Sequence, residues 1–145
     1  TFASEEKPDL IIDFATLTGS ARVALGTELP AVFVKDDDLY ETLKNASNKV
    51  HDPFWRLPLW ENYDKLNHSF VADISNSGQS SYAGAVTAAL FLKRFVDPLI
   101  PWIHIDLYSW NDKNSPGKPI GGEAMMMRGV FEFLKEYFTK KLRIE

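Results

Sequence analysis

The 145-residue sequence predicts one layered α/β domain, in which a central mixed sheet is flanked by helices. Two short apolar runs, at 10–15 and 31–34, have the length and β-branched content of buried strands. A third segment, at 102–107, alternates apolar and polar residues as a strand does. Helical periodicity fills much of the chain between them, and strands that alternate with helices indicate a layered α/β fold.

The composition is that of a globular chain and excludes several function classes. Hydrophobic residues make up 45% and charged residues 25%, which argues against disorder. The net charge of −4 removes the electrostatic attraction on which nucleic-acid binding depends. The absence of cysteine excludes disulfides and thiolate metal sites. No apolar stretch is long enough to span a membrane and the N-terminus does not resemble a signal peptide, so a cytoplasmic protein is expected. The chain does not begin with Met, which hints at a fragment or a processed chain.

The first long helix is predicted over about 39–50, because apolar residues recur there at helical spacing. Asp38 and Glu41 fit a capping box at its start. The run of three aspartates at 36–38 is interpreted as favouring the positive end of the helix dipole rather than as a cation site.

The middle of the chain is less regular. Prolines in the aromatic connector at 54–60 deny it regular structure over most of its length. A short helix is predicted at 61–68 and an edge strand at 70–74. A further helix runs from about Tyr82 to Val96, and its small residues at 83–89 predict close packing against a neighbour.

The C-terminal part is predicted to be a loop over 110–122, followed by a helix from Gly122 to about Leu142. Helical spacing assigns the apolar face of that helix to Met127, Val130, Phe131, Leu134 and Phe138.

Residues 16–19, Thr-Leu-Thr-Gly, form the best candidate for a ligand-facing loop. They directly follow a predicted buried strand, and ligands of open α/β sheets bind beyond the carboxyl ends of strands. Glycine also permits close approach of the backbone to a ligand. From the residues alone, a plain strand-to-helix turn is the slightly favoured interpretation.

The rest of the sequence gives little support for a complete catalytic or metal site within this chain. His104 and Asp106 share one face of a predicted strand, but no second histidine stands at ligand spacing, so both are expected to pair with neighbouring groups. No nucleophile elbow, phosphate-binding loop or dinucleotide fingerprint occurs. A serine triad using His51, His68 or His104 has nothing positive in its favour.

Several motifs, in order along the chain, resemble those of the leucyl (cytosol) aminopeptidase family. Residues 13–21 resemble its Asp-x-Ala-Thr-Leu-Thr-Gly-Ala segment, and residues 55–60 its Trp-Arg-Leu-Pro-Leu stretch. Residues 83–92 resemble its Ala-Gly-x-x-Thr-Ala-Ala-x-Phe-Leu helix, and residues 102–106 its Trp-x-His-x-Asp strand. Weaker matches occur at 71–73, where Phe70 replaces a common Lys, and at 121–124. The resemblance covers nearly the whole chain and identifies it as the C-terminal part of the catalytic domain.

The resemblance implies a partial zinc-peptidase-like fold and a parent enzyme that releases leucine-like N-terminal residues from peptides with two divalent ions, zinc or manganese. The family's metal ligands are a Lys and carboxylates, notably in an Asn-Thr-Asp-Ala-Glu-Gly-Arg-Leu motif whose Arg holds a bicarbonate. That motif does not occur in residues 1–145, and neither does the family's N-terminal domain. This chain alone is therefore expected to bind no metal, to contain no catalytic residue and to be inactive.

The resemblance assigns substrate-binding roles to five residues. Thr16 and Gly19 match positions that line the pocket for the first side chain, and the backbone of Leu17 matches a group that contacts substrate and bicarbonate. Counting from the Trp-x-His-x-Asp strand, Tyr108 and Asn111 match further pocket positions. Tyr108 is larger than the small residue often found there, so a preference for leucine is not secured.

Two other functions remain open. The family forms hexamers as paired trimers, so the chain is expected to derive from a homo-oligomer that acts on peptides. A non-catalytic assembly module is the main alternative, in which the aromatic connector at 54–60 mediates association. The simpler interpretation of this connector is that it packs onto its own domain. Some bacterial relatives also bind DNA, but the acidic balance opposes that here, and neither a nucleic-acid nor a membrane partner is expected.

Overall fold

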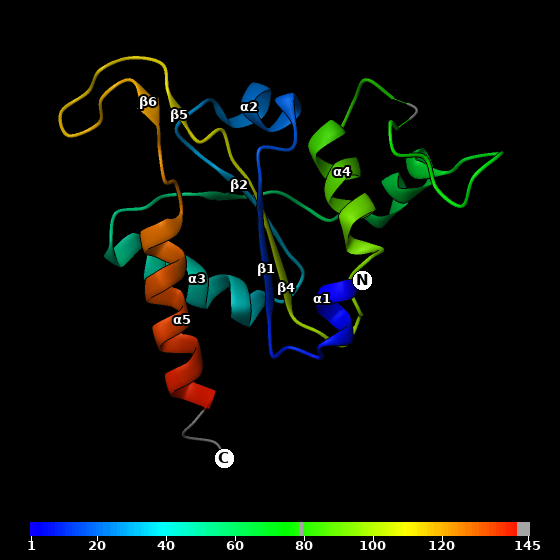
Figure 1. Cartoon of the computed structure of the whole chain (residues 1–145), viewed down its shortest axis with the longest axis horizontal. Coiled ribbons are helices and arrows are strands. Elements are labelled where there is room, and N and C mark those ends of the chain that lie inside the picture. Colours follow the sequence, from blue (N-terminus) through cyan, green and yellow to red (C-terminus); the bar gives the residue numbers. More distant parts are fainter. Residues whose placement is uncertain (79, 142–145) are drawn as a thin grey trace.

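A mixed four-stranded sheet forms the centre of the molecule, as the sequence predicts (Figure 1). The computed structural model describes residues 1–78 and 80–141. The strands are β1 (Ile11–Ala15), β2 (Ala31–Val34), β3 (Trp55–Arg56) and β4 (Trp102–Asp106), in the order β1-β4-β2-β3. β4 is parallel to β1 and antiparallel to β2, whereas β3 is parallel to β2.

Helices cover both faces of this sheet, and each face has its own apolar core (Figure 1). On one face, Val32 and Ile103 pack with residues of α3 (Asp37–Lys49) and α5 (Met127–Lys141). On the other face, Phe33 packs with residues of α2 (Gly19–Leu25) and α4 (Gly84–Lys93). Every residue of β4 is buried, so the alternation seen in its sequence reflects polar side chains enclosed under α2 and α4 rather than a face open to water.

The predicted helix near 39–50 is confirmed as α3, but its predicted cap is wrong. The helix begins at Asp37, so Asp36 is the N-cap, and its Oδ1 accepts a hydrogen bond of 2.7 Å from the backbone N–H of Leu39. Asp38 lies inside the first turn, and Glu41 instead pairs with Lys44 at 3.1 Å. With three consecutive aspartates, the sequence alone does not distinguish which one takes the cap position.

The two aspartates give a matched test of this assignment. Asp36→Ala is expected to lower the free energy of unfolding by about 1 kcal/mol, because it removes the cap bond to the first turn. Asp38→Ala leaves that bond in place, and its expected cost is within about 0.5 kcal/mol of zero. Urea denaturation of the two variants checks the order, and a larger loss for Asp38→Ala would contradict the cap assignment.

The C-terminal helix begins later than predicted. Residues that the sequence assigns to its start form β6 (Gly121–Gly122), which pairs with β5 (Trp110–Asn111) in a two-stranded hairpin inside the predicted loop. The helix starts at Met127, and its predicted end at Leu142 lies outside the described residues.

The predicted apolar face of α5 is only partly correct. Val130 is buried, as predicted, and Leu134 is partly buried. Met126 and Phe133 are fully buried, whereas the predicted core residues Met127 and Phe131 are 60% and 65% exposed. Phe138 is also exposed. The buried face is therefore rotated from the predicted one, since several apolar residues on this helix are exposed.

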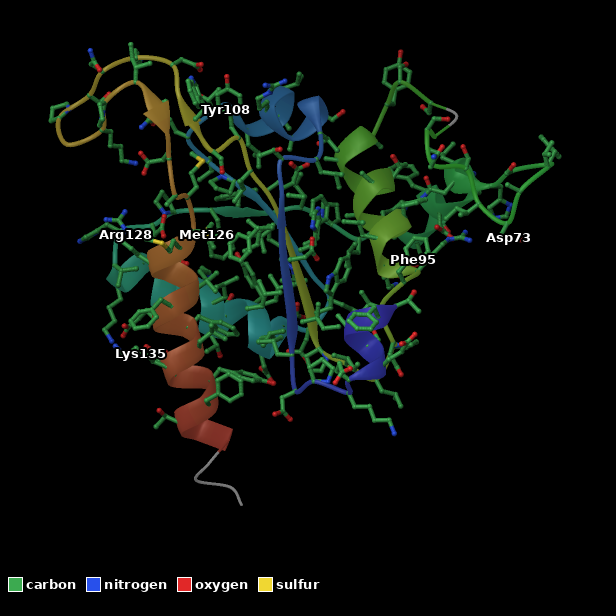
Figure 2. The ribbon with its side chains drawn as sticks, in the orientation of Figure 1. Asp73, Phe95, Tyr108, Met126, Arg128 and Lys135 are labelled. Carbon is green, nitrogen blue, oxygen red and sulfur yellow. The ribbon has the colours of Figure 1, made fainter. Side chains whose placement is uncertain are left out.

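The start of α5 is set by the carboxylate of a residue far away in the sequence, which the hydrophobic pattern of the helix does not predict. Asp52 is buried, and its two oxygens accept hydrogen bonds from the backbone N–H groups of Met126, at 3.1 Å, and Gly129, at 2.9 Å. Met126 lies at the top of α5 in Figure 2. The partner of the helix start is thus more than 70 residues away along the chain.

The segment between α3 and α4 is less regular than the sheet. The connector at 54–60 packs mainly onto its own domain, through Phe54, Leu57 and Leu59, and two of its residues form β3. The predicted short helix is confirmed as the 3-10 helix η1 (Glu61–Asn67). The edge strand predicted at 70–74 is wrong, because this segment forms bends and its apolar residues Phe70 and Val71 are almost fully exposed.

The small residues of α4 allow close helix packing, as predicted. A Cβ atom added to Gly84 would lie 2.4 Å from the Oγ atom of Ser20 in α2. The helix itself is shorter than predicted, since it begins at Gly84 and leaves Tyr82 81% exposed. Ala83 takes a left-handed conformation there, with φ 57°, and forms the N-cap in place of a further helical turn.

One edge of the sheet is open in the described part of the chain. β1 pairs with β4 on one side, and no described strand pairs with its other side. The strand has no lysine, proline or bulge of the kind that protects natural edge strands, and its Phe14 is 48% exposed. Among the described residues, no helix has the length and apolar character needed to cross a membrane.

Candidate functional site

The 16–19 loop lies where the sequence predicts, at the carboxyl end of β1 and the start of α2. Because β1 and β4 are parallel, with Ala15 opposite Asp106, the loop stands next to the carboxyl end of β4. This edge of a sheet is where α/β proteins place ligands. The side chain of Thr16 and the residue Gly19 are exposed there, and Leu17 is 42% exposed.

Asp106 fixes the conformation of this loop. Its carboxylate is 2% exposed and accepts hydrogen bonds from the backbone N–H groups of Leu17, at 3.0 Å, and Thr18, at 3.3 Å. It also accepts a 2.6 Å bond from the Thr18 hydroxyl. That hydroxyl oxygen in turn accepts from the N–H of Ala21 and so caps α2. A buried carboxylate with this many donors holds the backbone rigidly and turns Thr16 and Leu17 outward.

His104 belongs to a separate buried layer below the loop. Its Nδ1 lies 2.6 Å from Oδ1 of Asp13, and Oδ2 of the same carboxylate accepts a 2.7 Å bond from Nε1 of Trp102. The ring is also stacked between Phe33 and Trp102. The prediction that His104 and Asp106 pair with neighbouring groups is confirmed, although they pair with different partners.

Tyr108 is held beside the loop through α2. The guanidinium of Arg22 lies 4.9 Å from the centre of the Tyr108 ring, and Figure 2 shows Tyr108 close to α2. The Tyr108 hydroxyl donates a 2.9 Å hydrogen bond to Asp112, and this bond raises the pKa of Tyr108 above its usual value. The guanidinium of Arg22 also lies next to the loop, since a Cβ added to Gly19 would be in contact with its Nη2 atom at 3.6 Å.

Asn111 forms hydrogen bonds within the β5–β6 hairpin and not with the 16–19 loop. Its amide donates to the carboxylate of Glu123, at 2.7 Å, and to the carbonyl of Pro119, at 3.2 Å. Hydrogen bonds from Asn111 and then Lys118 lower the pKa of Glu123. The structure therefore brings Tyr108 to the 16–19 loop through Arg22, while Asn111 is engaged with the β5–β6 hairpin.

A cavity of about 300 Å³ opens on the other side of the loop. Leu17 and Thr18 line it together with α4, the buried amide residue Asn67 and the polar segment at 75–78. Its lining combines hydroxyl and amide groups with the apolar side chains of Phe91 and Leu92. Ligand pockets combine apolar walls with a few polar groups, and this cavity offers both.

Metal ligation has no basis in the described part of the chain. Among residues 1–78 and 80–141, no three His, Asp or Glu side chains are grouped so that they could hold a metal ion. The two carboxylates nearest the loop layer, Asp13 and Asp106, are committed to hydrogen bonds with protein donors. The residues present therefore do not fit a two-metal centre.

Comparison with known proteins identifies the family of this site. The family described as the cytosol aminopeptidase family, catalytic domain, matches residues 1–131. The chain belongs to this family. Its loop at 16–19 and its strand β4 thus stand in the catalytic domain of a peptidase family, as the motifs indicate.

Individual relatives agree with this assignment. The chain is 41% identical to a probable cytosol aminopeptidase of Prochlorococcus marinus (strain MIT 9312), over 93% of this chain and 28% of the relative. Among solved structures, the cytosol aminopeptidase of Coxiella burnetii is 55% identical, with a TM-score of 0.88 over 93% of this chain and 30% of the other. The bottromycin maturation enzyme BotP in complex with Mn is 37% identical, with a TM-score of 0.84 over 89% and 29%. The chain therefore spans less than a third of the length of these three proteins.

Sequence reasoning missed two parts of the site. The anchoring role of Asp106 depends on the pairing of β1 with β4, which brings together residues 88 and 89 positions apart. The sequence did offer one signal for this role, an acidic residue at the end of a predicted buried strand, because a buried carboxylate needs hydrogen-bond donors. Arg22 gave a weaker signal, as a cation in a short helix that otherwise presents small and apolar residues.

Proposed function

We propose that the intact protein is a dimetal aminopeptidase and that this chain supplies the substrate-binding half of its site. The observation that carries the proposal is the exposed 16–19 loop, which a buried carboxylate holds rigidly at the carboxyl edge of the sheet. Membership of the cytosol aminopeptidase family supports a peptide substrate and hydrolysis at its N-terminus. A cytoplasmic location belongs to the same proposal, because the relatives are named cytosol aminopeptidases.

The two divalent ions, zinc or manganese, would be held by residues outside this chain. Manganese is present in the BotP complex, whose chain is more than three times as long as the matching part. The open edge of β1 supports this arrangement, since an apolar strand with one unpaired side suits the interior of a wider sheet. In this proposal, residues 1–145 form the C-terminal portion of the catalytic domain, and the N-terminal domain and metal-binding segment precede them.

The residues of this chain would bind and orient the substrate. The exposed Thr16 and Gly19 border the space for the first side chain, and the backbone at Leu17 faces the substrate chain. Tyr108 stands at the same edge of the sheet. Asn111 would reach the pocket only if its amide were released from Glu123. Rigid placement of these groups lowers the entropic cost of aligning the peptide for attack.

The proposal is tested by assaying the intact protein and the isolated chain in parallel. We expect the intact protein to hydrolyse amino-acid p-nitroanilides when Mn²⁺ or Zn²⁺ is supplied, and to lose this activity with a chelator. The isolated 145-residue chain is expected neither to cleave the substrates nor to bind zinc stoichiometrically. Hydrolysis by the isolated chain would refute the half-site assignment, and an inactive metal-loaded intact protein would refute the peptidase assignment.

A second candidate role is assembly into a homo-oligomer, such as the hexamer expected for the family. Two tryptophans of the 54–60 connector favour it, since Trp55 is 61% exposed and Trp60 is 55% exposed on a connector that is otherwise largely packed. Exposed tryptophans are enriched at protein interfaces. Light scattering coupled to size exclusion tests this role, and a monomer of the isolated chain at high concentration would argue against assembly through this connector.

A further inference from the structure

A second cavity, of about 450 Å³, lies at the edge of the sheet opposite the 16–19 loop. It opens at the amino end of β4 and just beyond the carboxyl end of β2, whereas the loop follows the carboxyl end of β1 (Figure 1). Its volume falls within the roughly 300–1,000 Å³ that is typical of small-molecule sites. We propose that this cavity binds a free amino acid with an apolar side chain, such as leucine, at a site separate from the substrate loop.

The floor of the cavity is apolar and shielded from water. Trp102, at the start of β4, is buried, and Leu59, Val96 and Ile100 beside it are partly buried. These side chains come from three separate segments, which are the connector, the turn after α4 and the sheet. A floor of this kind removes an aliphatic side chain from water, and that burial provides the main favourable free energy of binding.

The rim of the cavity carries two basic and two acidic side chains, which are Lys35, Lys93, Asp36 and Asp97. The ammonium of Lys93 is paired with the carboxylate of Glu61. The ammonium of Lys35, in contrast, forms no hydrogen bond or ion pair with any residue in the described part of the chain. Lys35 is therefore the cation on this rim that is available for a ligand carboxylate.

The two aspartates of the rim are only partly used by the protein. Oδ1 of Asp36 accepts the cap bond from Leu39, and Oδ1 of Asp97 accepts a 2.9 Å hydrogen bond from the backbone N–H of Leu99. Among the described residues, no donor reaches Oδ2 of either aspartate. These two oxygens can accept hydrogen bonds from a ligand ammonium group.

Charges of both signs beside an apolar floor favour a ligand that has the same three features. A free amino acid with an aliphatic side chain has all of them, in a carboxylate, an ammonium group and an apolar tail. A plain carboxylate would be repelled by the two aspartates, and a plain amine would leave Lys35 without a partner. The inference rests on the proposed function only in that this ligand is also the product of the proposed reaction.

Isothermal titration of the metal-loaded intact protein with L-leucine tests the location of the site. Lys35→Met keeps the aliphatic stem and removes the charge, and we expect it to weaken leucine binding at the cavity about tenfold or more, the effect of one charge-assisted hydrogen bond. Lys65→Met, at another exposed lysine that lies outside the cavity lining, is the matched control and is expected to change nothing. Unchanged leucine binding in Lys35→Met, or an equal loss in Lys65→Met, would overturn the inference.

Three smaller probes test the chemistry of the ligand. They are 4-methylpentanoate, which lacks the ammonium group of leucine, 3-methylbutylamine, which lacks its carboxylate, and glycine, which lacks its side chain. We expect each to bind the Lys35-dependent site about tenfold or more weakly than leucine does. Asp97→Asn keeps an oxygen acceptor for Leu99 and is expected to weaken the binding of leucine but not that of 4-methylpentanoate. A probe that binds as tightly as leucine would overturn the assignment of an amino acid.

Hydrolysis of amino-acid p-nitroanilides by the same variants separates this inference from the proposed function. Lys35→Met is expected to keep the kcat/KM of the wild type, because the cavity and the 16–19 loop lie at opposite edges of the sheet. A parallel loss of hydrolysis would contradict two separate sites. An intact protein that binds leucine through Lys35 but hydrolyses nothing would support the cavity and refute the peptidase assignment. One that hydrolyses peptides but binds leucine independently of Lys35 would refute the cavity alone.

Discussion

Asp106→Ala is expected to lower the free energy of unfolding by about 3 kcal/mol and to release the 16–19 loop, the largest effect that we expect from one substitution at the site. The substitution leaves the N–H groups of Leu17 and Thr18 and the Thr18 hydroxyl without their shared acceptor in a half-buried position. Each unsatisfied buried donor costs about 1–3 kcal/mol, and partial access to water offsets some of that sum. Urea denaturation measures the loss of stability.

Hydrogen exchange distinguishes release of the loop from a general loss of stability. The amides of Leu17 and Thr18 are expected to lose protection in Asp106→Ala more than amides of α3 do. Thr18→Val is the comparison variant, because it leaves Asp106 as acceptor for the two loop amides. It removes the hydroxyl bond to Asp106 and the cap bond from the N–H of Ala21, and we expect it to cost about 1–2 kcal/mol. Thr18→Ser keeps the hydroxyl and is expected to behave almost like the wild type. Unchanged protection of both loop amides in Asp106→Ala would contradict the anchoring role.

Asp52→Ala is the second large effect and is expected to lower the free energy of unfolding by about 2–3 kcal/mol. The Asp52 carboxylate is 7% exposed and accepts hydrogen bonds from two backbone N–H groups at the start of α5. Its removal leaves both donors buried and also removes a negative charge from the positive end of the helix dipole. Because α5 packs against α3 through Val130 and Phe133, fraying of its first turn also loosens that core.

Two controls test whether the effect comes from the hydrogen bonds. Asp52→Asn keeps one acceptor oxygen, so its expected cost lies between zero and that of Asp52→Ala. Asp38→Ala removes an equal charge at an exposed site in the first turn of α3 and is expected to be nearly neutral. Thermal denaturation followed by far-UV circular dichroism provides the measurement. Equal losses for Asp38→Ala and Asp52→Ala would show that net charge, rather than the capping bonds, determines the stability.

The local sequence pattern was sufficient to predict the helices and strands whose apolar residues follow a regular period. The strands β1 and β2 are short apolar runs, and α3 has a regular apolar stripe, so periodicity located all three. The mixed sheet and its flanking helices follow from the alternation of these elements. The segment at 70–74 looked like a strand for the same reason, but no strand in the described part of the chain pairs with it, and it forms bends.

Features set by distant contacts could not be predicted. The start of α5 depends on Asp52, and the rotation of its buried face depends on packing against α3. The same limit applies to the site. The position of the 16–19 loop followed from the strand before it. Its anchor, Asp106, and the contacts of Tyr108 with Arg22 and Asp112 depend on strand pairing and packing that no local pattern records.

The most direct test of the account grafts this chain into a solved relative. The matching segment of the Coxiella burnetii cytosol aminopeptidase is replaced by residues of this chain, which superpose on it with a TM-score of 0.88 at 55% identity. In the proposed arrangement, the host supplies the metal-binding part and this chain supplies the substrate half. We predict metal-dependent release of N-terminal amino acids by the graft, and its loss on Asp106→Ala. A graft that folds and binds metal but releases no amino acid from any peptide would contradict the assignment of this chain as a substrate-binding half-site.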